Sequence, residues 1–255
     1  MTAGILSGST QDRRAPFAPQ HRWDRNFFLT YVLLIWIGIL GGFVPEIVAH
    51  INSNAPAYPL ILHIHAVAFV GWLVLLTSQV TLIRRSRHDL HRTIGVAGMA
   101  LAAAMVLIGP ATAIVMQRYH WGTADSDPAF LAIQFTDIII FAGLVTAGFV
   151  LRGDPSAHKR LILLATLHIG NAGFARFFGG TLDRMLGDGM FGFVASMYPA
   201  DVLVLGLGAY DLVTRQRLHR VYLPAIAWIA AWQLIATYLY HMPWWKMFAI
   251  HLIGH

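Results

Sequence analysis

The chain has 255 residues, of which 57% are hydrophobic and 12% are charged, with a formal net charge of +6 at pH 7 and a mean hydropathy of +0.60. Because a soluble domain carries about 25% charged residues, this composition excludes an ordinary soluble protein and predicts a membrane protein. The absence of cysteine excludes disulfides, iron–sulfur clusters and thiolate metal sites.

In chain order, residues 1–26 are polar and basic and lack the apolar region of a cleavable signal peptide, so we expect a cytoplasmic basic tail. A transmembrane domain is predicted over residues 27–241, and an interfacial or periplasmic tail over residues 242–255. Within the domain, seven apolar runs approach the roughly 20 residues that a spanning helix needs. They are residues 27–49, 59–83, 93–116, 129–151, 160–178, 196–213 and 220–241. The Gly-rich stretch 179–193 is interpreted as a long connector.

One pattern occurs three times: a basic turn ends in His followed by Arg or Lys, and a new apolar run begins. The turns are residues 84–92, 152–160 and 214–220, and together with the N-terminal segment they hold 14 of the 18 Lys and Arg residues. Because Lys and Arg concentrate on the cytoplasmic side of membranes, we predict an all-α polytopic bundle of seven transmembrane helices. One helix would be followed by three helical hairpins, with the N-terminus inside and the C-terminus outside.

This placement also predicts the location and the partners. The expected location is the bacterial inner membrane, with the basic turns against anionic lipids of the cytoplasmic leaflet. Other membrane subunits are possible partners. Nucleic acid is excluded as a partner because the basic residues are divided among separate short turns.

Polar residues inside the apolar runs are the first candidates for function, since burying them in lipid is costly. The 1.5 Å rise per helical residue places several at similar depths in the outer half of the bundle. If they face inward, they form a cluster that suits a divalent metal or an axially held heme b. A single membrane histidine is more often a packing residue, whereas an intramembrane Asp must be protonated, paired or bound to a ligand. These candidates are His65, Gln134, Asp137, His168 and Asn171.

The histidines of the three basic turns form a possible second site at the inner face. His91, His158 and His219 begin successive apolar runs at equal depth and could converge on one ligand. The alternative is that each anchors its turn among lipid headgroups. Gln79 and Gln233 are interpreted as structural residues that form hydrogen bonds between helices.

The stretch HAVAFVGWLVLLTSQVTLIRRSRHDLHRTIGVAG (65–98) resembles a pattern of uncharacterised bacterial multi-span membrane proteins with His-Arg-x-x-Gly turns. The stretch HKRLILLATLHIGNAGFARF (158–177) resembles a later segment of the same family. This resemblance covers the second to fifth runs and implies a shared architecture, without an activity. A looser similarity is to heme membrane proteins of the cytochrome b561 type, which place histidines at helix starts after basic turns. Those proteins pair their histidines at matching depths, and here His168 has no evident partner at its depth.

Three functions follow as hypotheses. The first is a membrane protein that holds a heme or metal through its histidines and performs redox or metal-dependent chemistry. The second is a non-catalytic accessory or assembly subunit, because no recognised catalytic motif is present. The third is a proton-coupled small transporter that uses Asp137 and Glu46.

Overall fold

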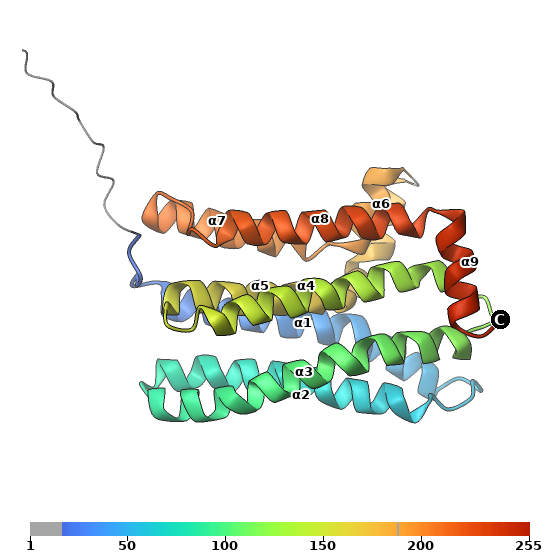
Figure 1. Cartoon of the computed structure of the whole chain (residues 1–255), viewed down its shortest axis with the longest axis horizontal. Coiled ribbons are helices and arrows are strands. Elements are labelled where there is room, and N and C mark those ends of the chain that lie inside the picture. Colours follow the sequence, from blue (N-terminus) through green and yellow to red (C-terminus); the bar gives the residue numbers. More distant parts are fainter. Residues whose placement is uncertain (1–16, 188) are drawn as a thin grey trace, which may run out of the picture.

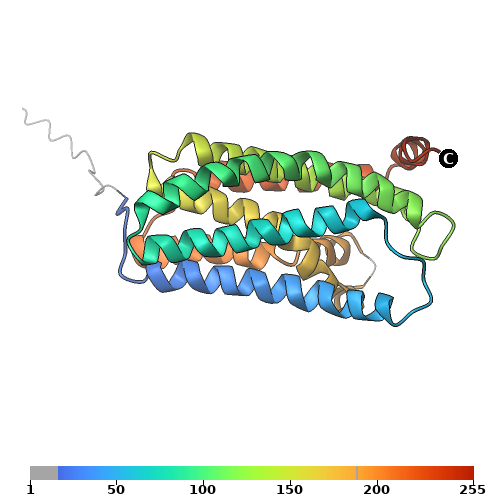
Figure 2. The same ribbon diagram turned by 90° about the horizontal axis from the view of Figure 1, so that it is seen from below.

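The computed structural model describes residues 17–187 and 189–255, and every regular element within these ranges is helical. Figures 1 and 2 show long helices that run side by side, with a short helix lying across one end of the bundle. The elements are α1 (Asp24–Ile51), α2 (Leu60–Arg84), α3 (His88–Tyr119), η1 (Pro128–Phe130), α4 (Leu131–Val150), α5 (Pro155–Leu186), α6 (Met190–Met197), α7 (Asp201–Arg215), α8 (Tyr222–Tyr240) and α9 (Pro243–Leu252).

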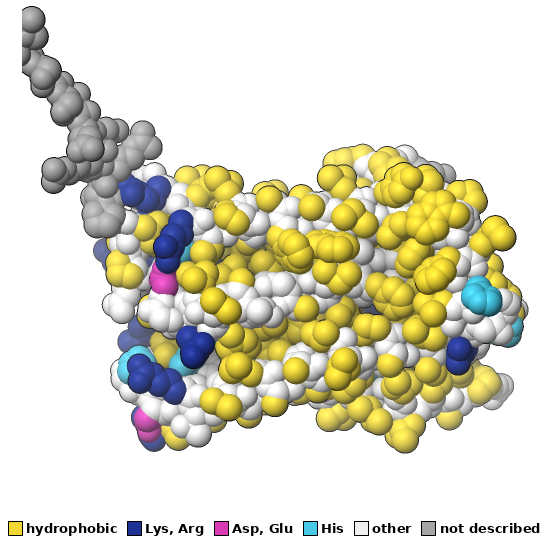
Figure 3. Space-filling model, viewed as in Figure 1, with side chains coloured by type: hydrophobic (Ala, Val, Ile, Leu, Met, Phe, Trp, Pro, Cys, Tyr) yellow, Lys and Arg dark blue, Asp and Glu magenta, His cyan; other side chains and the backbone are white. Residues whose placement is uncertain are grey.

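Among the described residues, six helices are long and apolar enough to cross a membrane, and the bent pair α6–α7 makes a seventh if it counts as one span. The protein is therefore a multi-pass membrane protein with a helical bundle. In Figure 1, α2 and α3 form one layer, α1, α4 and α5 the middle, and α7 and α8 the third. Lys and Arg side chains gather at one end, while apolar side chains cover the long flanks (Figure 3). We call this end, with the turns 84–92, 152–160 and 214–220, the basic end.

Helix α5 is the most deeply packed span, with 67% of its apolar window buried, compared with 28% for α1. Its contact with α1 depends on glycine. A Cβ atom added to Gly42 would lie 2.1 Å from the carbonyl oxygen of Gly173, and one added to Gly173 would lie 2.7 Å from the Cα of Ile39. The two backbones therefore touch, an approach that small residues permit in membranes.

The Gly-rich stretch 179–193 is not the long connector that the sequence suggested. Helix α5 continues to Leu186, and α6 begins at Met190. The first glycine of this stretch allows close packing of the two helices, because a Cβ added to Gly179 would lie 2.9 Å from the carbonyl oxygen of Ser196 on α6. The tail also contains a helix, α9, whose Trp245 donates a hydrogen bond to the carbonyl of Ala129 at 3.0 Å.

Candidate functional site

The sixth apolar run is broken inside the bundle. Helices α6 and α7 meet at an angle of 76°, and Pro199 lies between them. Proline has no N–H and disfavours the helical conformation of the residue before it. Tyr198 accordingly adopts φ −126° and ψ 47°. This break leaves backbone groups without helical partners in a region where water is scarce.

Asn171 of α5 supplies the missing partners. Its side-chain amide donates to the carbonyl of Met197, and its carbonyl oxygen accepts the N–H of Ala200 at 3.1 Å. Asn171 is buried, and its two bonds lie on either side of the break. Its role is therefore to hold the broken span against α5, which differs from the ligand role that the sequence suggested.

Next to the break, His168 of α5 and Asp137 of α4 form a pair. The His168 Nε2 atom lies 2.9 Å from an Asp137 carboxylate oxygen, and the two side chains are 1% and 17% exposed. Asp137 lies about 9 Å along the axis of α4 from its first residue, at a rise of 1.5 Å per residue. The Tyr198 ring stacks on the His168 ring, with centroids 6.3 Å apart. The pair is thus enclosed well inside the span.

A second carboxylate lies at the same break. Asp201 opens α7 and accepts two hydrogen bonds from the Gln233 amide of α8, at 3.0 and 3.1 Å. Its main-chain N–H donates to the carbonyl of Tyr198 at 3.0 Å, and the Tyr198 ring faces His168. We call Asp137, His168, Tyr198, Asp201 and Gln233 the polar cluster. Among the described residues, no Lys or Arg forms an ion pair with Asp137 or Asp201, so the cluster contains two carboxylates and one histidine without a permanent positive charge.

The polar cluster opens onto a small crevice between α7 and α8. Its volume is about 150 Å³. Asp201 and Gln233 are its polar residues, and its other walls are apolar side chains: Val204, Leu205, Ile226, Ile229 and Ala230. This volume is below the roughly 300–1,000 Å³ of common ligand pockets, so the crevice has room only for a very small molecule.

The outer-half cluster expected from the sequence forms only in part. Asp137 and His168 meet as expected, but the His65 ring stacks on Phe69, with centroids 3.9 Å apart. The His65 Nδ1 atom and the Gln134 side-chain oxygen are buried without a hydrogen-bond partner among the described residues. Within residues 17–187 and 189–255, no three His, Cys, Asp or Glu side chains take up a metal-ligating arrangement. A heme b or metal at this site stays a prediction.

The inner histidines also converge only in part. The His91 and His158 rings lie with centroids 6.3 Å apart, at right angles. His219 has other neighbours: its ring meets Phe17 edge-on at 4.7 Å, and its Nδ1 accepts the N–H of Val221 at 3.3 Å. Burial and the nearby positive charge of Arg160 lower the pKa of His219, which favours its neutral form. The idea of three histidines on one ligand is therefore not supported by the contacts of His219.

The basic end also contains a network that sequence reasoning missed. Arg160 and Asp211 are both 0% exposed and form a two-pronged ion pair between α5 and α7, with one N···O distance of 2.8 Å. The Arg160 guanidinium also donates to the carbonyl and hydroxyl oxygens of Ser156, at 2.9 and 2.7 Å. This pair was hard to predict from the sequence, because Arg160 and Asp211 each lie in or beside a basic turn, where charged residues are expected.

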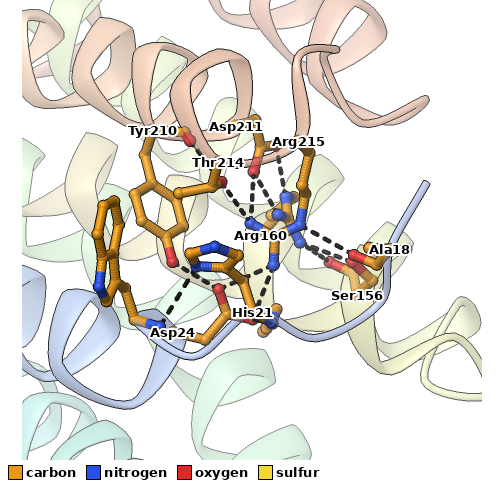
Figure 4. A network of polar contacts seen from close by, with 12 residues as sticks. Ala18, His21, Asp24, Ser156, Arg160, Tyr210, Asp211, Thr214 and Arg215 are labelled. Carbon is orange, nitrogen blue, oxygen red and sulfur yellow. Dashed lines mark hydrogen bonds and ion pairs between the residues drawn. The ribbon is translucent and has the colours of Figure 1, made fainter.

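Asp24 at the start of α1 is the second centre of this network (Figure 4). It accepts hydrogen bonds from Arg215 at 2.8 and 2.9 Å, from Lys159 at 2.7 Å and from the Tyr210 hydroxyl at 2.6 Å. The Phe17 ring covers the guanidinium groups of Arg160 and Arg215, at 4.9 and 5.1 Å. Each carboxylate here has a basic partner, so the network joins α1, α5 and α7.

Of the two structural glutamines, Gln233 forms its predicted bond between helices. Both amide atoms of Gln79 are buried without a partner among the described residues, so the predicted bond of Gln79 is absent there. Asp201 and Tyr198 were not among the site residues predicted from the sequence, although an acid two positions after Pro199 in the sixth apolar run indicates an irregular span.

No family model, no curated protein and no solved structure matches the chain. The resemblances noted from the sequence therefore stay predictions, and the function is argued from the residues alone.

Proposed function

We propose that this multi-pass membrane protein is a small proton-coupled transporter, in which the polar cluster binds and releases a proton next to the solute site. The crevice beside Asp201 and Gln233 is the proposed solute site, and its volume of about 150 Å³ suits only a small polar solute. The observation that carries the proposal is the Asp137–His168 pair beside a second carboxylate at a broken span.

The charges of the cluster support proton binding. Two carboxylates and one histidine in hydrocarbon, without Lys or Arg partners, are costly if both carboxylates are ionised. The least costly state retains at least one proton, shared along Asp137, His168 and Asp201. A carboxylate beside an imidazole places a proton acceptor and a proton donor within hydrogen-bond distance, which is the geometry that proton transfer requires.

The broken span supports a solute site. Many secondary transporters bind substrate and coupling ion where a discontinuous helix exposes backbone groups near the middle of the membrane. Here α6 and α7 break at Pro199, and Asp201 and Tyr198 adjoin the break. Those transporters are built from inverted repeats, whereas this bundle contains three hairpins of the same direction. The likeness is therefore confined to the broken span.

The orientation of the bundle in the membrane is part of the same proposal. The basic end carries the turns rich in Lys and Arg, and the positive-inside rule places it in the cytoplasm of a bacterial cell, against anionic lipids. The polar cluster then lies in the outer half of the inner membrane. Cysteine-accessibility labelling of single cysteines at Ser86 and at Ser126, which lie in turns at opposite ends, tests this assignment.

Difference infrared spectroscopy tests whether the cluster holds a proton. The purified protein in lipid nanodiscs should show a protonated carboxyl band at neutral pH that disappears as the pH rises. Asp201→Asn or Asp137→Asn should remove or shift that band, whereas Asp125→Asn, in an exposed loop, should leave it unchanged. Absence of a protonated carboxyl at neutral pH in the wild-type protein contradicts the proposal.

Proteoliposomes with an internal pH dye test proton movement. With a pH gradient imposed and a panel of small polar solutes added outside one at a time, the wild-type protein should move protons across the membrane together with the solute that it transports. Asp137→Asn should slow this flux at least about 10-fold, since general acid–base transfer by one positioned group contributes 10²–10⁴-fold. Equal flux in Asp137→Asn, Asp125→Asn and wild type refutes the assignment of Asp137.

A further inference from the structure

A second group of polar side chains, separate from the polar cluster, lies at the basic end. His91 lies in the first turn of α3 and His158 in the first turn of α5, and their rings lie edge to face with centroids 6.3 Å apart. Gln79 lies near the end of α2, and its Nε2 atom is 3.8 Å from the position that a Cβ of Gly95 would occupy, one turn after His91 on α3. Three helices thus place two imidazoles and one amide together.

His158 is held in the orientation that metal-binding histidines commonly have. Its Nδ1 atom lies 2.8 Å from the carbonyl oxygen of Gly148 on α4. A carbonyl can only accept a hydrogen bond, so Nδ1 carries the proton and the Nε2 lone pair remains available. Metal-ligating histidines usually donate their other ring N–H to a carbonyl or carboxylate in this way.

The remaining polar atoms of this group have no partner among the described residues. They are the Nδ1 atom of His91 and both amide atoms of Gln79, and all three are buried. Buried polar atoms normally have a hydrogen-bond partner, and three without one on neighbouring helices are unusual in a well-packed bundle. Their shared position indicates that a bound group satisfies them.

We propose that His91 and His158 together bind a transition-metal ion, with the Gln79 amide bonded to it or to another of its ligands. With metal–nitrogen bonds of about 2.0–2.1 Å, two imidazoles on opposite sides of one ion have ring centroids roughly 6 Å apart. Two imidazoles at a tetrahedral angle on the same ion have ring centroids roughly 5 Å apart. The observed 6.3 Å therefore fits ligands on opposite sides of the ion. His219 takes no part, because it has partners of its own.

The ion is either a bare divalent cation or the iron of a porphyrin, and imidazole nitrogens bind both. This inference does not depend on proton binding at Asp137, so either proposal can fail alone.

Metal analysis and an optical spectrum of the purified wild-type protein test the proposal. The protein is expressed with added iron, zinc and a heme precursor, in a His251→Gln/His255→Gln background that removes the exposed histidine pair of the tail. About one transition-metal ion per chain is expected. A Soret band with matching iron identifies a porphyrin, and zinc or copper without it identifies a bare ion. Less than about one-tenth of an ion per chain overturns the proposal.

Matched variants locate the ion. His91→Gln and His158→Gln should each lower the bound metal at least about 10-fold, since loss of even an outer-shell partner costs 10–100-fold in affinity. His88→Gln, an exposed histidine in the same turn, should retain full occupancy, as should Asp137→Asn. Equal metal content in His91→Gln and His88→Gln overturns the assignment. If the variants fail to fold, X-ray absorption spectroscopy of the wild-type protein counts the imidazole ligands of the bound metal. A count below two refutes the proposal.

Discussion

The two charged regions of the bundle differ in how their carboxylates are balanced. At the basic end, Asp24 and Asp211 each meet Arg or Lys side chains directly. In the polar cluster, the side-chain partner of Asp137 among the described residues is a histidine, and that of Asp201 is an amide. A permanently paired carboxylate contributes to structure, whereas a carboxylate whose partner can lose its proton can change state. The ion pairs of the basic end therefore hold the helices together, whereas the proposed role of the polar cluster is to change its protonation.

The largest expected effect is at the basic end. Arg160→Met should lower the free energy of unfolding by about 3–5 kcal/mol, because it leaves Asp211 buried and unpaired. Unfolding by sodium dodecyl sulfate in mixed micelles measures this loss. The double variant Arg160→Met/Asp211→Leu should regain most of it. Equal instability of the single and double variants would show that the cost comes from lost packing instead.

Asn171→Leu should have the next largest effect. It leaves the Ala200 N–H and the Met197 carbonyl without partners at the break, at about 1–3 kcal/mol for each buried group. Limited proteolysis should then cut near residues 187–200 faster than in the wild-type protein. The neighbouring exposed change Phe178→Leu on the same helix is the control and should leave the cleavage rate unchanged.

Asp137→Asn sharpens the comparison, because its cost in stability should be small. An amide can replace a protonated carboxyl beside His168, so we expect a loss below about 1 kcal/mol, the size of one neutral hydrogen bond. The same detergent titration as for Arg160→Met measures it. A loss as large as that of Arg160→Met would make the Asp137–His168 pair a structural ion pair.

The smallest effect concerns Asp154, which caps α5 outside the spans. Burial raises its pKa, but hydrogen bonds from the N–H of Ala157 and from Arg220 outweigh this and lower the pKa below the usual 3.8. Its contribution to stability is therefore complete above pH 3.8 and is lost as the pH falls through the lowered value. Asp154→Asn, which can still cap the helix, should remove this part of the acid dependence, by less than about 1 kcal/mol. Identical pH curves for the two proteins would contradict the assignment.

The sequence predicted the helices well because apolar runs and basic turns follow directly from the cost of placing charge in lipid. It predicted the proximity of Asp137 and His168 from their depth alone. Depth does not specify the direction in which a side chain points, so it could not show that the His65 ring stacks on Phe69 or that the His219 ring meets Phe17. The break at Pro199 could not be placed either, because it depends on Asn171, which lies 28 positions earlier in the chain and satisfies the exposed backbone.

The glycine contact between α1 and α5 has a consequence for motion. With Gly42 against Gly173, the two backbones meet without a side chain between them at this point, so neither helix can slide along the other there without a clash. Helix α7 is attached to α5 at two places, through Asn171 at the break and through the Arg160–Asp211 ion pair at the basic end. Any opening of the crevice would therefore leave α7 in one stationary frame with α1 and α5, and it would come from a movement of α8 relative to α7.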